Sequence, residues 1–76
     1  MILETNKYYK HPSGVCIVVV SKTMYGPNTE VYLIEQAGDP YHTISSLPID
    51  SPVIDEMTEI TSEEWILAVQ NAERGN

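Results

Sequence analysis

The feature that most constrains the fold is a run of six consecutive apolar residues at positions 15–20, VCIVVV. Successive side chains of a strand point to opposite faces, so this run predicts a strand that is apolar on both faces and lies at the centre of a sheet. Residues 31–34 repeat the pattern more weakly. A short chain can cover the second face in three ways: the sheet curls into a barrel, the chain supplies a helix, or another chain pairs with it.

Turn-forming residues recur at short intervals along the chain. Clusters rich in Pro, Gly, Asn, Asp and Ser lie at residues 11–14, 25–28, 37–40 and 47–52. A spacing of roughly eight to twelve residues between turns is typical of a small antiparallel β structure. We therefore expect strands at residues 6–10, 15–23, 29–36, 41–46 and 56–60, the first four of them in a meander.

The C-terminal residues predict one α-helix. Thr61 and Glu64 have the spacing of a capping box, in which each side chain bonds the backbone N–H of the other residue. A stripe with helical spacing should pack on the sheet, and Arg74 and Gly75 suit the C-terminal end. The stripe consists of Trp65, Ala68, Val69 and Ala72. The expected fold is one α+β domain over residues 1–76, a small antiparallel β-meander or SH3-like partial barrel of four or five strands with one C-terminal α-helix.

Composition excludes several classes of function. The chain has 76 residues, with four basic and eleven acidic side chains and a formal net charge of −7. Four basic residues cannot supply the roughly six or more phosphate contacts of a typical DNA-binding protein, so direct nucleic-acid binding is not expected. No signal-peptide-like segment and no membrane-length apolar run occur, and the single cysteine, Cys16, cannot form an internal disulfide. We expect a cytoplasmic protein with no membrane partner.

No motif for catalysis or metal binding stands out. His11 and His42 both lie beside turns, and the chain contains no nucleophile elbow, phosphate-binding glycine loop or HExxH motif. Two histidines and one cysteine at unrelated spacings make a weak zinc signature. We therefore expect no catalytic residue, no metal site and no cofactor.

Three short motifs give the chain a family resemblance. Residues 7–14 read Lys-Tyr-Tyr-Lys-His-Pro-Ser-Gly, residues 22–26 read Lys-Thr-Met-Tyr-Gly, and residues 58–65 read Thr-Glu-Ile-Thr-Ser-Glu-Glu-Trp. With these motifs the chain resembles a group of small phage and prophage proteins, most of them uncharacterised, over most of its length apart from residues 35–55. The resemblance implies a viral or mobile-element origin and a compact β fold with a terminal helix, and it carries over no catalytic residues. Small acidic phage proteins of this size often inhibit host machinery, as anti-CRISPR proteins and other anti-defence factors do.

The charges are unevenly distributed along the chain. Residues 1–22 hold three lysines and one glutamate, a balance of +2, whereas residues 23–76 hold one arginine and ten acids, a balance of −9. Residues 50–64 contain six acids and no basic residue: Asp50, Asp55, Glu56, Glu59, Glu63 and Glu64. Such a stretch could imitate a phosphate backbone and occupy a basic nucleic-acid channel. It could equally be a solvated face that keeps a small protein soluble, and the capping box already explains Glu63 and Glu64.

The aromatic residues are five tyrosines and one tryptophan, with no phenylalanine. Tyrosine suits binding surfaces because it combines a large contact area with a hydrogen-bonding hydroxyl. Tyr8 and Tyr9 face opposite sides of a strand, so only one of them fits in the core. We expect Tyr9 or Tyr8, together with Tyr25 on its loop, to be displayed for binding.

These observations predict a non-enzymatic, phage-type inhibitor that binds a host protein with a basic surface, one that handles nucleic acid. The predicted partner-binding residues are Tyr9, Tyr25, Asp50, Asp55, Glu56, Glu59 and Glu63. Two alternatives stay open: a binding protein that sequesters a small ligand or nucleotide at an oligomer interface, and a structural assembly module. The two-sided apolar strand also leaves a homodimer open.

Overall fold

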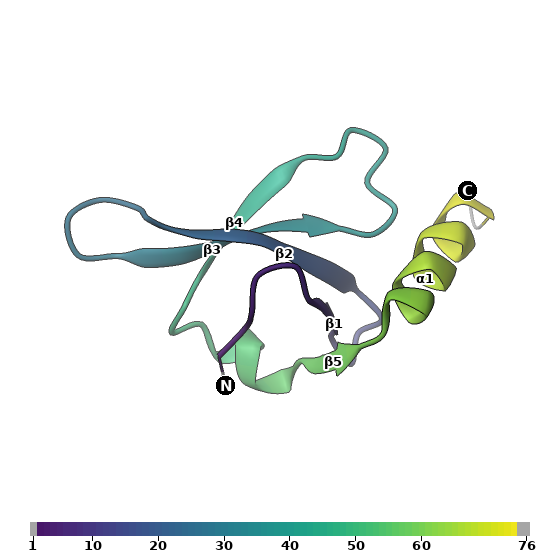
Figure 1. The fold of residues 1–76 in the computed structure, drawn as a ribbon, viewed down its shortest axis with the longest axis horizontal. Coiled ribbons are helices and arrows are strands. Elements are labelled where there is room, and N and C mark those ends of the chain that lie inside the picture. The colour runs from purple at the N-terminus through teal and green to yellow at the C-terminus, as the bar shows by residue number, and fades with distance from the viewer. Residues whose placement is uncertain (1, 75–76) are drawn as a thin grey trace.

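The computed structural model describes residues 2–74 and shows an antiparallel sheet followed by one α-helix (Figure 1). The strands are β1 (Tyr8–Lys10), β2 (Cys16–Met24), β3 (Glu30–Gln36), β4 (Ile44–Pro48) and β5 (Thr58–Ile60); a short 3-10 helix η1 (Pro52–Glu56) precedes β5, and α1 spans Ser62–Arg74. The sheet has the order β4-β3-β2-β1-β5 and ends in two unjoined edges, so it is open and not a closed barrel. This confirms the predicted α+β class with one C-terminal helix.

The central position predicted for residues 15–20 is confirmed, because β2 pairs with both β1 and β3. The second face of β2 is covered less completely than expected. Ile17 and Val19 are buried, but Val20 is 41% exposed. The ladder shifts register between Val19 and Ser21, so Val20 lies in a β-bulge without a direct partner on β3.

The main buried cluster lies on one face of the sheet. Directly opposed residues of an antiparallel pair point to the same face, which places Tyr9 with Ile17 and Tyr32 with Leu47. The N-terminal segment and η1 cover this face, and Figure 1 shows them side by side on one side of the sheet. The buried cluster consists of Leu3, Tyr9, Ile17, Val19, Tyr32, Ile54 and Met57.

The fourth strand was predicted at residues 41–46, but β4 spans Ile44–Pro48. The residues before β4 form a tight loop instead, because the Asp39 carboxylate accepts hydrogen bonds from the backbone N–H groups of Tyr41 at 2.9 Å and Thr43 at 2.8 Å. The loop places His42 in the left-handed region with φ +52°. The predicted fifth strand is likewise shorter, because residues 52–56 form η1.

The predicted helix start is confirmed. The Glu64 N–H donates to Thr61 Oγ1 at 3.1 Å, and the Thr61 N–H donates to Glu64 Oε1 at 3.3 Å, which completes the capping box. The predicted stripe of Trp65, Ala68, Val69 and Ala72 is half-buried. Gly75 lies outside the described residues.

The helix packs beside one end of the sheet rather than across a face (Figure 1). The Trp65 ring stacks on Tyr8 with the ring centroids 5.2 Å apart. Ala72 approaches the loop before β4 so closely that a Cβ atom added to Gly38 would lie 2.6 Å from the Ala72 Cβ. Neither helix of residues 2–74 is long and apolar enough to cross a membrane.

Gly38→Ala should destabilise the protein more than Gly26→Ala. Both glycines have positive φ values, +91° and +85°, so both substitutions carry a similar backbone cost of roughly 1–2 kcal/mol. Only the methyl group at position 38 would collide with α1, which should add about 1–3 kcal/mol. Urea denaturation of the two variants measures the difference. Equal losses would contradict the close approach of α1 to this loop.

The loop before β4 should loosen in acid. The backbone N–H groups of Tyr41 and Thr43 hold the pKa of Asp39 below its ordinary value of 3.8. The stabilisation from this carboxylate is therefore fully present above pH 3.8 and is lost as the pH falls through the lower folded-state pKa. An NMR titration of the Tyr41 and Thr43 amide shifts should show a midpoint below 3.8, and this transition should be absent in Asp39→Asn.

Candidate protein-binding surface

Residues 50–64, here called the acidic segment, run from the end of β4 through η1 and β5 to the first turn of α1. The segment is anchored by buried apolar residues, namely Ile54, Met57 and Ile60. All the predicted acidic binding residues on it are exposed: Asp50, Asp55, Glu56, Glu59 and Glu63. The segment therefore presents carboxylates to solvent from a backbone that the core holds in place.

The first hairpin, basic in sequence, lies against the acidic segment. β1 pairs with β5 in the register Tyr9↔Glu59. This pairing brings Lys7 Nζ to 3.9 Å from Glu59 Oε2. The basic first hairpin and the acidic segment, which are far apart in sequence, are thus adjacent in the fold. Lys7 neutralises part of the negative charge of the acidic segment.

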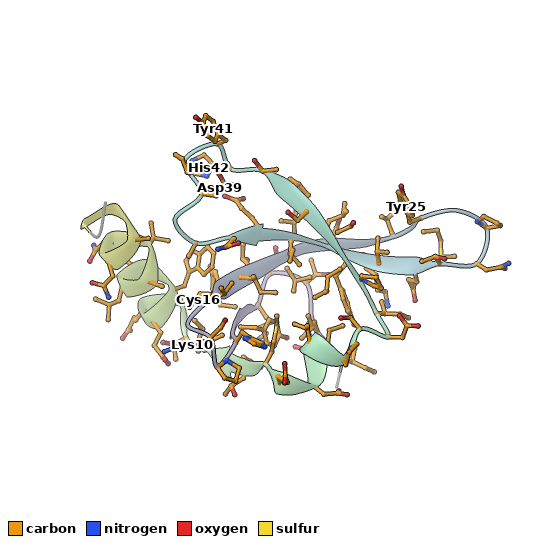
Figure 2. The ribbon with its side chains drawn as sticks, turned by 180° about the vertical axis from the view of Figure 1, so that it is seen from behind. Lys10, Cys16, Tyr25, Asp39, Tyr41 and His42 are labelled. Carbon is orange, nitrogen blue, oxygen red and sulfur yellow. The ribbon has the colours of Figure 1, made fainter. Side chains whose placement is uncertain are left out.

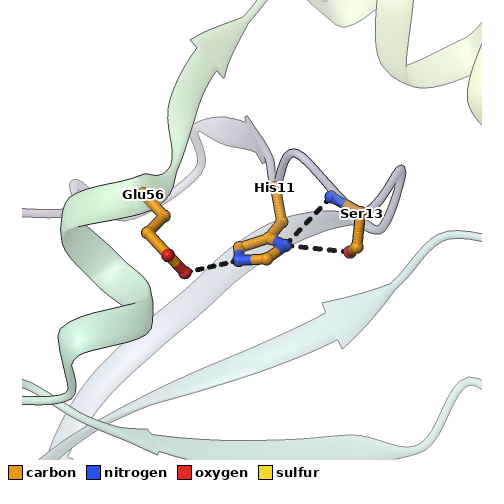
Figure 3. A network of polar contacts seen from close by, with 3 residues as sticks. All are labelled: His11, Ser13 and Glu56. Carbon is orange, nitrogen blue, oxygen red and sulfur yellow. Dashed lines mark hydrogen bonds and ion pairs between the residues drawn. The ribbon is translucent and has the colours of Figure 1, made fainter.

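His11 makes a second link between the first hairpin and the acidic segment (Figure 3). Its Nδ1 accepts the Ser13 backbone N–H at 3.1 Å and lies 2.8 Å from Ser13 Oγ, while its Nε2 lies 2.8 Å from Glu56 Oε2. Because Nδ1 accepts a backbone N–H, Nε2 carries the proton and donates it to Glu56. The ring therefore ties the turn after β1 to η1.

The same three side chains superficially resemble a Ser–His–Glu catalytic triad. The Nδ1 atom that would have to take the proton of Ser13 Oγ is shared with the backbone N–H of Ser13 itself. The Glu56 side chain is 59% exposed, so the cluster lacks the water-excluded setting that activates a nucleophile. The geometry accounts for the cluster as a structural tie.

The prediction that Tyr9 is displayed is wrong. Tyr9 is 2% exposed because it faces the core opposite Ile17, and its hydroxyl accepts the Glu4 N–H at 2.8 Å. Tyr8, the alternative, is half-buried against Trp65. The side chain that sequence reasoning missed is Tyr41, which is 86% exposed on the loop before β4 (Figure 2).

The other predicted residues fall into two groups. Tyr25 is 73% exposed in the β2–β3 loop, at the opposite end of the molecule from Lys10 (Figure 2). Asp50 shares a shallow pocket with Met24 and Thr29, which flank that loop. Asp55, Glu56, Glu59 and Glu63 lie instead on η1, β5 and the start of α1. The structure thus separates Tyr25 from most of the acidic segment.

A groove of about 580 Å³ separates α1 from the hairpin of β1 and β2. Lys10, Cys16 and Asn71 are among the residues that line it. The other two lysines of the first hairpin do not converge there, because Lys7 pairs with Glu59 and Lys22 with Glu30. Among the described residues no group of three or more His, Cys, Asp or Glu side chains is arranged to hold a metal ion.

Comparisons with protein-family models, with curated proteins and with solved structures find no match for the chain.

The tie between His11 and Glu56 should be measurable as a coupling energy. A double-mutant cycle with His11→Ala and Glu56→Ala should give about 0.5–1 kcal/mol, because the 2.8 Å contact is a charge-assisted hydrogen bond. The matched cycle with Lys7→Ala and Glu59→Ala, whose charged atoms are 3.9 Å apart, should give a smaller value. Urea denaturation at neutral pH measures both. A larger coupling for the lysine pair would contradict the geometry in Figure 3.

Proposed function

We propose that the protein is a non-enzymatic inhibitor that binds a basic surface of a host protein through the acidic segment. The observation that carries the proposal is the contrast within that segment: Ile54, Met57 and Ile60 are buried and hold its backbone, while the five predicted acidic residues are exposed. A fixed array of carboxylates can match a fixed array of basic groups without first being ordered, which lowers the cost of binding.

Electrostatics favours a basic partner. The acidic segment contains no lysine or arginine, and the chain as a whole carries a formal charge of −7. Complementary charge of this kind raises association rates and rejects acidic partners. Proteins that bind nucleic acid present lysine and arginine side chains to phosphates, and an array of carboxylates can compete with the phosphates for these side chains. The resemblance of residues 7–14, 22–26 and 58–65 to phage and prophage proteins is the reason for placing the partner in a host cell.

The contacts of Lys7 and His11 refine the mechanism. These two side chains occupy Glu59 and Glu56, so a partner must compete with internal contacts for part of the acidic segment. Both contacts involve partly exposed side chains, and such pairs contribute only about 0–1 kcal/mol each. A partner with arginines in bidentate geometry could therefore displace them at little cost.

The test neutralises three carboxylates without changing their shape. The triple variant Asp55→Asn, Glu56→Gln, Glu59→Gln should lose the basic partner that wild-type protein captures from a bacterial lysate. The captured proteins are identified by mass spectrometry, and the partner should be released by added duplex DNA and by salt. A partner retained unchanged by the triple variant would contradict the proposal.

The chain offers a matched control. The triple variant Glu4→Gln, Glu30→Gln, Glu35→Gln also moves the net charge from −7 to −4. It removes a lysine contact at 3.8 Å and a histidine contact at 2.8 Å, much like those of Glu59 and Glu56. This control should bind normally. Equal loss in both variants would mean that overall charge, rather than the acidic segment, attracts the partner.

A second candidate function is sequestration of a small ligand in the groove beside α1. Its volume of about 580 Å³ is comparable with that of small-molecule sites, which occupy roughly 300–1,000 Å³. Lys10 is the single lysine on the groove lining. Native mass spectrometry of protein purified from cells decides this point, because a retained ligand adds mass that Leu67→Trp, which fills the groove, should remove.

A further inference from the structure

The two edges of the sheet differ in what they offer to another strand. In β1, the N–H and C=O of Tyr9 point toward β2, so those of Tyr8 and Lys10 point toward β5. Their partners on β5, Ile60 and Thr58, therefore direct their own N–H and C=O groups toward β1. This leaves only the N–H and C=O of Glu59 on the outer side of β5. The charged side chain of Glu59 disfavours the addition of another strand at this short edge, as charged residues commonly do on edge strands.

The β4 edge is longer and carries no charged side chain. The Ile49 N–H donates to the Glu30 carbonyl oxygen. Because backbone groups alternate sides along a strand, the N–H and C=O groups of Ser45 and Leu47 also point toward β3. Ile44 and Ser46 therefore direct their N–H and C=O groups outward, away from the sheet. β4 contains no charged residue, and its one protective feature is Pro48 at the C-terminal end.

Acidic residues flank this edge. Asp39 lies in the loop that leads into β4, close to His42 and Tyr41 (Figure 2), and Asp50 follows β4 after one residue. The sequence contains no lysine or arginine between Lys22 and Arg74. A strand that pairs with β4 thus meets uncharged backbone groups in the middle and a carboxylate at each end.

A second copy of the chain fits this edge poorly. One twofold register that satisfies both outward N–H groups pairs Ile44 with Ser46 of the second copy, and another pairs Ser46 with Ser46. In an antiparallel pair the end of one β4 lies opposite the start of the other, so the turn that carries Asp50 faces the loop that carries Asp39 of the second copy, and symmetry repeats this approach. Like charges brought together across a strand pair are destabilising, and the one basic side chain of this loop, His42, already contacts Glu35 of its own chain at 2.8 Å.

We propose that β4 is a strand-addition site for an extended, basic segment of a partner protein, which pairs with Ile44 and Ser46 and places lysine or arginine near Asp39 and Asp50. The backbone groups supply the bonding, and the flanking carboxylates select the charge of the segment. The proposal rests on the proposed function for the basic character of the partner and shares Asp50 with the acidic segment, but it uses the opposite edge of the sheet from β5.

The probe is a synthetic peptide, acetyl-Lys-Lys-Thr-Val-Thr-Val-Thr-Lys-Lys-amide, and the readout is amide hydrogen exchange by NMR. In the free protein the amides of Ile44 and Ser46 should exchange faster than those of Ser45 and Leu47. Saturating peptide should slow the Ile44 and Ser46 amides by at least about tenfold, the factor that one added hydrogen bond can supply. A peptide with glutamate in place of each lysine should leave them unchanged. Protection by both peptides, or by neither, would overturn the proposal.

Ser46→Pro provides the matching variant, since the N–H that it removes points outward and serves no bond within the sheet. It should weaken peptide binding at least about tenfold, whereas Ser46→Ala, which keeps the N–H, should not. If Ser46→Pro unfolds, the exchange experiment on the wild-type chain still decides. Protection of Ile44 and Ser46 that grows with protein concentration alone would identify a second copy as the occupant and overturn the proposal.

The lysate experiment separates this proposal from the proposed function. Loss of the partner in Asp55→Asn, Glu56→Gln, Glu59→Gln but not in Ser46→Pro, together with an unresponsive peptide, would leave the acidic segment as the binding surface and remove β4. Loss in Ser46→Pro alone would do the reverse.

Discussion

The fold depends on how a single small sheet covers its core face. Residues 2–74 form a single sheet with no second sheet layer, so the N-terminal segment and η1 supply the cover through Leu3, Ile54 and Met57. Two buried tyrosines hold that N-terminal segment in place. The Tyr32 hydroxyl accepts the Leu3 N–H at 3.1 Å, and the Tyr9 hydroxyl accepts the Glu4 N–H at 2.8 Å. The hydroxyls thus satisfy backbone donors that phenylalanine would leave unpaired, which gives a physical reason for an aromatic core built from tyrosine.

Local chemistry made parts of this fold predictable. The capping box needs only Thr61 and Glu64 three residues apart, and the stripe on α1 follows from helical periodicity, so both appear where the sequence placed them. The loop before β4 was mispredicted because Asp39 bonds the amides of Tyr41 and Thr43 and so competes with strand pairing. Its side chain outweighs the strand tendency of the residues that follow.

The candidate surface was predictable in part for a different reason. Exposure of the carboxylates in the acidic segment follows from their charge, since charged side chains are rarely fully buried. The burial of Tyr9 does not follow, because alternation says only that Tyr8 and Tyr9 face opposite ways. The choice is made by the long-range register Tyr9↔Ile17. The contact between Lys7 and Glu59 likewise needs the pairing of β1 with β5, which no local pattern encodes.

The charge balance connects the two proposed surfaces. Of the three lysines in the first hairpin and β2, Lys7 and Lys22 already contact carboxylates on neighbouring strands. The chain has no further lysine or arginine until Arg74, so its acidic excess cannot be cancelled by rearrangement within the fold. It cannot be cancelled by a second copy either, because the copy brings the same excess. Neutralisation must come from a partner of opposite charge or from counterions, and the partner is favoured wherever its basic groups are held in a matching arrangement, because binding then releases the counterions of both surfaces.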